Sequence, residues 1–101
     1  MILVYFTCKD RAEAKAISKQ LVESRLVACA VRLPAKSIYR WEGKLQDSSE
    51  VVVLCKTTEA NREKVFEEIK SLHSYDVPCI ISFKADSAND EYDKWVISET
   101  R

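Results

Sequence analysis

The chain has 101 residues, the size of one domain, and its 47% hydrophobic content excludes a disordered polymer. Its 16 basic and 16 acidic residues cancel and no basic run stands out, which argues against a nucleic-acid-binding protein. No stretch reaches the about 20 apolar residues of a membrane span, and the N-terminus lacks the features of a signal peptide. We therefore expect a cytoplasmic protein without a membrane partner.

The N-terminal part of the chain predicts a buried strand and an amphipathic helix. Residues 2–7 are apolar and rich in β-formers, which favours a strand buried on both faces. Asp10 can cap the helix that follows, and Glu13 completes a variant of the capping box. Apolar residues then recur at helical spacing up to about Arg25, so this helix should pack one face on the core.

The middle of the chain predicts a long hairpin. A strand covers residues 27–33, and Pro34, which lacks an N–H, predicts a bulge or a break. The strand resumes over residues 37–41 and ends in a tight turn at 42–43, where glycine accepts a positive φ. The chain then returns over residues 44–57, with an apolar second half.

The C-terminal part predicts a helix, a strand and a closing helix. Thr57 or Thr58 caps the first of these helices. Its apolar stripe consists of Val65, Phe66, Ile69 and Leu72. A strand over residues 79–83 and a helix over about residues 88–98 follow. The inner face of this last helix should carry Tyr92, Trp95 and Val96.

The resulting order, β-α-β-β-α-β with an extra C-terminal helix, predicts an α+β, ferredoxin-like fold made by a single domain over residues 1–101. Such a fold has an antiparallel sheet with two helices on one face. Residues 51–54 are apolar on both faces of their strand, so the second face of the sheet also needs a cover. The last helix is too small for this, and we infer an oligomer.

Short motifs across almost the whole chain carry a resemblance to a known family. The specific ones are residues 37–44 (SIYRWEGK) and 72–78 (LHSYDVP). Weaker ones are Thr7, residues 26–30, Glu50, Lys56 with Thr57, and Tyr92 with Trp95. With these motifs the sequence resembles the CutA family of divalent-cation tolerance proteins. The resemblance implies a homotrimer whose long hairpins pack on neighbouring subunits. It also implies binding of copper or other divalent ions in metal homeostasis, without an organic cofactor or an established reaction.

The sequence departs from the family pattern near the second helix. Ser74 stands where the family usually has a proline, and Cys79 stands where a glutamate often follows. Some bacterial members carry a cysteine before the strand-one threonine and a pair of histidines, the residues proposed there for copper. Here Phe6 and Leu72 occupy two of these places and only His73 remains, so the copper site cannot be transferred whole.

His73, the single histidine, has two interpretations. At a helix C-terminus its ring N–H can satisfy free carbonyls and complement the helix dipole. As a metal ligand it needs partners, because a tight copper or zinc site has three or four ligands. A trimer could supply them if three His73 side chains converge on the axis, or if Cys8 or Cys79 lies close. The soft thiol of Cys79 would suit Cu(I), so His73 and Cys79 are the candidate metal ligands, with simple burial as the alternative for Cys79.

Four large aromatic residues and one lysine are the candidates for a ligand cleft: Tyr39, Trp41, Tyr75, Trp95 and Lys56. Aromatic residues with polar tips occur in ligand clefts and in subunit interfaces alike. Lys56 ends a strand that we expect near Tyr75, and it could contact an anion or form an intersubunit salt bridge. These residues define an alternative function, a trimeric scaffold resembling the PII signalling proteins in architecture, which binds a small ligand or protein partner in its intersubunit clefts.

Catalysis is not predicted. His73 and Cys79 could form a thiolate pair, but they are six positions apart in the chain and Pro78 lies between them, which makes direct contact doubtful. The single glycine excludes a glycine-rich phosphate-binding loop.

The four cysteines should be free thiols, because they are widely spaced and form no CxxC motif. If Trp41 pairs with Lys44 in the hairpin, Cys29 lies opposite Lys56. The Cys29 and Cys55 side chains then point to opposite faces of the sheet, which argues against a disulfide.

Overall fold

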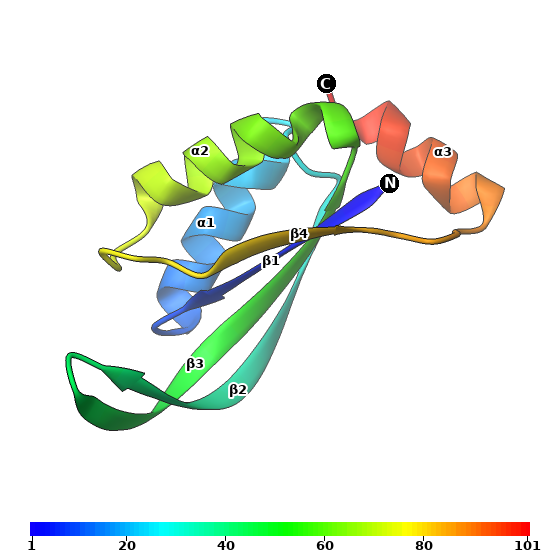
Figure 1. The fold of residues 1–101 in the computed structure, drawn as a ribbon. Helices are drawn as coiled ribbons and strands as arrows, with labels where there is room; N and C mark the ends of the chain where they lie inside the picture. The colour runs from blue at the N-terminus through cyan, green and yellow to red at the C-terminus, as the bar shows by residue number, and fades with distance from the viewer.

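The computed structural model describes residues 1–101, and its elements follow the predicted order (Figure 1). They are β1 (Ile2–Cys8), α1 (Arg11–Glu23), β2 (Cys29–Trp41), β3 (Lys44–Thr57), a 3-10 turn (Glu59–Asn61), α2 (Arg62–Leu72), β4 (Ile80–Lys84) and α3 (Asp90–Glu99). The strands form one antiparallel sheet in the order β2-β3-β1-β4. Helices α1 and α2 lie together on one face of this sheet, which confirms the α+β, ferredoxin-like fold with an added C-terminal helix. No helix has the combined length and apolarity needed to cross a membrane.

The core lies between the sheet and these two helices. Alternate residues of β1 point towards the helices, and Ile2, Val4 and Phe6 are at most 2% exposed. The buried cluster comprises Ile2, Val4, Phe6, Cys8, Ala14, Ile17, Leu21, Val27, Val51, Val53, Cys55, Val65 and Ile69. Removing such apolar surface from water, at about 25 cal/mol per Å², is the main source of the stability of the chain.

The other face of the sheet is also apolar, and much of it is open to solvent in the single chain. One continuous row across it runs through Val31, Leu54, Tyr5 and Ile81, which are neighbours in register on four adjacent strands. Val31 is 39% exposed and Ile81 is 52% exposed. An apolar face of this kind marks an interaction surface. The single chain therefore leaves open the face that, from the sequence, we expect an oligomer to cover.

Pro34 does not interrupt β2, so the predicted bulge is wrong. The pairing of β2 with β3 continues without a slip from Cys29 opposite Lys56, and Pro34 lies opposite Val51. Strand β2 is at the edge of the sheet and has a neighbour on one side only, where a proline is tolerated. The predicted register holds, and all cysteines, Cys55 among them, are free thiols.

Neither threonine caps α2 with its side chain, contrary to the sequence prediction. Thr57 is the last residue of β3, and its hydroxyl donates to the Leu26 carbonyl at 2.6 Å. Thr58 precedes the 3-10 turn without a side-chain hydrogen bond, and α2 begins only at Arg62. Leu72, predicted in the buried stripe, is 42% exposed, because it is the last residue of the helix.

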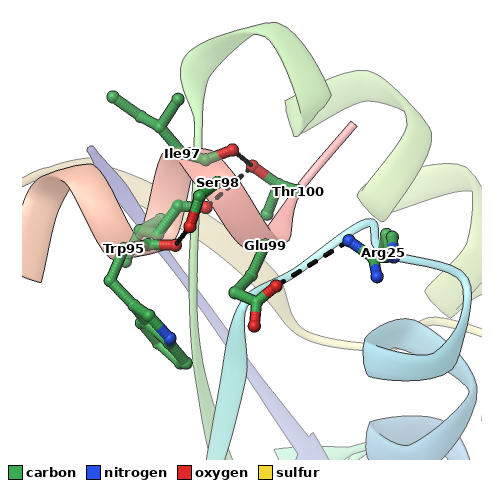
Figure 2. Close-up of polar contacts among 7 residues, drawn as sticks. Arg25, Trp95, Ile97, Ser98, Glu99 and Thr100 are labelled. Carbon is green, nitrogen blue, oxygen red and sulfur yellow. Dashed lines mark hydrogen bonds and ion pairs between the residues drawn. The ribbon is translucent and has the colours of Figure 1, made fainter.

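Helix α3 lies beyond the end of the sheet, beside the N-terminal end of α2 (Figure 1). Of its predicted inner residues only Val96 is fully buried, and Trp95 is 41% exposed. Its last turn is closed by hydroxyl groups, since Ser98 donates to the Trp95 carbonyl at 2.8 Å (Figure 2). The Glu99 carboxylate lies 3.7 Å from the guanidinium of Arg25, which follows α1.

Candidate functional site

His73 connects the end of α2 to the end of β1. Its Nε2 atom is 2.7 Å from the carbonyl oxygen of Thr7, and its Nδ1 atom is 3.1 Å from the backbone nitrogen of Tyr75. The Tyr75 N–H donates to Nδ1, so the hydrogen bonds place the ring proton on Nε2, which donates to Thr7. The ring thus satisfies a carbonyl of the sheet, whereas the sequence predicted a carbonyl of the helix.

Three side chains of types that can ligate a metal meet at this point. The thiol of Cys8, a carboxylate oxygen of Glu13 and a ring nitrogen of His73 all lie within 4.8 Å of one another. Cys8 ends β1 and Glu13 lies in the first turn of α1, so the tight connection between these elements brings the two together. The sequence indicated Cys8 and Cys79 as possible partners of His73, and the structure supplies Cys8.

Glu13, which the sequence indicates as a helix-capping residue, has a second role. Its Oε1 atom accepts from the Lys9 N–H at 3.1 Å, and Oε2 accepts from the Ser74 N–H at 2.9 Å. Burial acts to raise the pKa of Glu13, but the hydrogen bonds from Ser74 and Lys9 outweigh it and lower the pKa below the ordinary 4.5. Glu13 is therefore a carboxylate at neutral pH, and it joins the loop before α1 to the loop after α2.

The Cys8 thiol is fully buried beside this carboxylate. Burial, assisted by the negative charge of Glu13, raises the pKa of Cys8 to about 12. The thiol is thus protonated at neutral pH. A soft sulfur, an imidazole nitrogen and a hard carboxylate oxygen form a mixed set of ligands that suits zinc and copper, and a set of three leaves a coordination position open.

A cavity of ≈ 500 Å³ adjoins this cluster, since it is lined by Thr7 and Ser74, whose backbone groups bond to His73 and Glu13. It is lined by Thr7, Tyr39, Trp41, Glu50, Ser74, Tyr75, Asp76, Val77 and Cys79. The Tyr75 hydroxyl donates to Oε2 of Glu50 at 2.9 Å. Burial and this hydrogen bond raise the pKa of Tyr75 well above its ordinary 10.0.

The structure brings together only some of the predicted site residues. Tyr39, Trp41 and Tyr75 share the cavity, as expected for a ligand cleft, and Cys79 is exposed at its edge and is not part of the cluster around His73.

Lys56 and Trp95 do not line this cavity. Lys56 pairs with Leu3 six residues along β3 from Glu50, or roughly 20 Å at the rise of a strand, so the expected proximity to Tyr75 is not found within the chain. The ring of Trp95 lies 5.5 Å from that of Tyr92 within α3.

Comparison with known proteins decides the family. A sequence model described as CutA1 divalent ion tolerance protein matches residues 2–99. The chain belongs to the CutA family. Among curated CutA relatives, the divalent-cation tolerance protein CutA of Pyrococcus horikoshii is 44% identical over 101 residues, which are 100% of this chain and 99% of the relative. The CutA of Thermus thermophilus is 38% identical over 99 residues, or 97% of this chain and 96% of the relative.

Solved CutA structures share the whole fold. The crystal structure of CutA1 from Pyrococcus horikoshii superimposes with a TM-score of 0.97 at 42% identity, covering 100% of this chain and 99% of the other. The structure of the divalent cation tolerance protein from Thermus thermophilus gives a TM-score of 0.94 at 38% identity and covers 100% of both chains. The long hairpin and the placement of three helices are thus features that this chain shares with other CutA proteins.

Proposed function

We propose that this CutA protein binds a copper or other divalent metal ion through Cys8, Glu13 and His73, and thereby contributes to metal homeostasis. The observation that carries the proposal is the convergence of three ligand atoms of different chemistry within 4.8 Å. Several proteins similar to this chain are named for tolerance of divalent cations, which supports a role in binding and not in catalysis. The alternative of a PII-like signalling scaffold has no comparable support among these relatives.

Metal uptake at this cluster has to be coupled to the release of a proton. The Cys8 thiol is protonated at neutral pH, and a metal binds the thiolate. The apparent affinity should therefore increase about tenfold per pH unit below the thiol pKa, because one proton leaves for each ion bound. His73 also gives up one of its two hydrogen bonds, to Thr7 or to Tyr75, if its ring nitrogen binds the ion.

Native mass spectrometry with Cu(I), Cu(II) and Zn(II), at two pH values, tests this function. We expect uptake of one ion per chain, stronger at the higher pH, that is lost in Cys8→Ser and in His73→Ala. Cys79→Ser is the matched control, because Cys79 is an exposed thiol outside the cluster and its loss should leave uptake unchanged. A protein that stays metal-free, or whose uptake ignores both cluster substitutions, would refute the proposal.

A further inference from the structure

The cavity beside the metal-binding cluster has walls of a distinct chemistry. Tyr39 and Trp41 are two residues apart on β2 and project from the same face of the strand. Tyr75 joins them from the loop between α2 and β4. Three aromatic rings from two separate parts of the chain therefore line one space of ≈ 500 Å³, which is within the usual size range of small-molecule sites.

The charged groups of this cavity are all negative. Glu50 and Asp76 line it, and no lysine or arginine does so. Glu50 is 8% exposed, and the hydroxyl of Tyr75 holds its Oε2 atom at 2.9 Å. Its Oε1 atom makes no hydrogen bond within the chain and is not sealed from solvent, so a residue that lines the cavity keeps a free acceptor.

We propose that this cavity binds a small organic cation with an ammonium or methylated ammonium head group. Aromatic faces attract such cations through the quadrupole of the ring, and a carboxylate held in place beside them supplies the opposite charge. Anions are disfavoured by Glu50 and Asp76. A bare metal ion fits less well, because the two carboxylates and the Cys79 thiol do not form a compact group of ligands as Cys8, Glu13 and His73 do.

The metal cluster and the ammonium cavity share no ligand residue, so an experiment can refute one proposal and leave the other standing. They are nevertheless neighbours, since Thr7 and Ser74 line the cavity while their backbone groups bond to His73 and Glu13. An occupant of the cavity would thus lie next to two residues whose backbone groups bond to proposed metal ligands.

Fluorescence of Trp41 reports directly on the cavity. The chain has two tryptophans, so Trp95→Phe leaves Trp41 as the single reporter. We expect tetramethylammonium chloride to change its emission saturably. Tert-butanol, a neutral molecule of similar size, should bind at least about tenfold more weakly, because it lacks the charge that the rings and Glu50 recognise. Sodium chloride at equal ionic strength should have no effect.

Substitutions then separate charge recognition from simple filling of the cavity. Glu50→Gln should weaken tetramethylammonium binding about tenfold, as measured by calorimetry, and Asp76→Asn should weaken it less. Asp47→Asn removes a carboxylate of the same hairpin outside the cavity and should change nothing. Cys8→Ser should abolish metal uptake and leave ammonium binding intact, because Cys8 does not line the cavity.

Three results would overturn the proposal: equal binding of tert-butanol and tetramethylammonium, no saturable response to either, or normal affinity in folded Glu50→Gln and Asp76→Asn proteins. Tyr75→Phe provides a second route if Glu50→Gln does not fold. It keeps the ring but releases Glu50, so affinity should decrease while the neutral probe is unaffected. Unchanged affinity for tetramethylammonium in Tyr75→Phe would also contradict the proposed role of the Tyr75–Glu50 pair.

Discussion

Ser18 is the one residue whose buried side-chain polar atom lacks a hydrogen-bond partner. It lies on the inner face of α1 and is 7% exposed. An unpaired buried hydroxyl costs about 1–3 kcal/mol, and alanine is the better helix former by about 0.5 kcal/mol. We expect Ser18→Ala to raise the free energy of unfolding by about 1 kcal/mol in urea denaturation, after allowance for the small space left behind.

Ser98→Ala is the matched control for this prediction. Ser98 is exposed and its hydroxyl donates to a carbonyl of its own helix, so its removal should change the unfolding free energy by less than about 0.5 kcal/mol. A lower urea midpoint in Ser18→Ala than in the wild-type chain would show that the Ser18 hydroxyl stabilises the fold.

Individual site residues could be predicted from the sequence only where their signal is local. The interaction of Glu13 with Asp10 spans three residues and is visible as a capping pattern. The contact of Glu13 with Ser74 spans 61 residues and that of Tyr75 with Glu50 spans 25, and neither leaves a periodic trace in the chain. This is why the sequence does not indicate two carboxylates central to the proposed sites as site residues.

Among the elements, the β2–β3 hairpin depends on two residues with positive φ at its tip. Glu42 has a φ of 50° and Gly43 a φ of 78°, which is the type I′ turn that fits the twist of a hairpin. A Cβ atom added at Gly43 would meet nothing within 4 Å, so Gly43→Ala tests backbone strain alone. We expect it to lower the unfolding free energy by about 1 kcal/mol in chemical denaturation.

A substitution that favours the positive φ of this turn should raise the unfolding free energy. Glu42→Asn creates the Asn-Gly pair that type I′ turns prefer, and should raise the unfolding free energy by about 0.5–1 kcal/mol. If both substitutions lower the unfolding free energy, or neither changes it, the positive φ angles of this turn do not determine the stability of the chain.

Elements with local signals could be predicted well, and those decided by tertiary contacts could not. The strand pairing of the hairpin follows from its turn, and the first helix follows from its cap. The predicted start of α2 is too early, because the Thr57 hydroxyl bonds to Leu26, 31 residues away, instead of capping a helix. The bulge predicted at Pro34 is absent because β2 is an edge strand, which the sequence alone does not show.

For the whole molecule, the uncovered sheet face is the strongest indication of how the chain assembles. Val31, Leu33, Ile81 and Phe83 are each between 39% and 52% exposed on this face, and an apolar patch of this kind is typical of an interaction surface. The CutA resemblance implies a homotrimer, and the open face provides the apolar surface that such an assembly would bury.

We expect a homotrimer in solution, with a mass close to three times 11.6 kDa in light scattering after size exclusion. Leu33→Glu places a charge on the open face and should dissociate it, because an unpaired buried charge costs several kcal/mol at each of the symmetric interfaces. Val22→Lys is the control: Val22 is 40% exposed on α1, in the helical layer away from this face. A monomeric wild-type chain would contradict the assembly. A trimer that tolerates Leu33→Glu as readily as Val22→Lys would place the interface elsewhere and leave the apolar face without a cover.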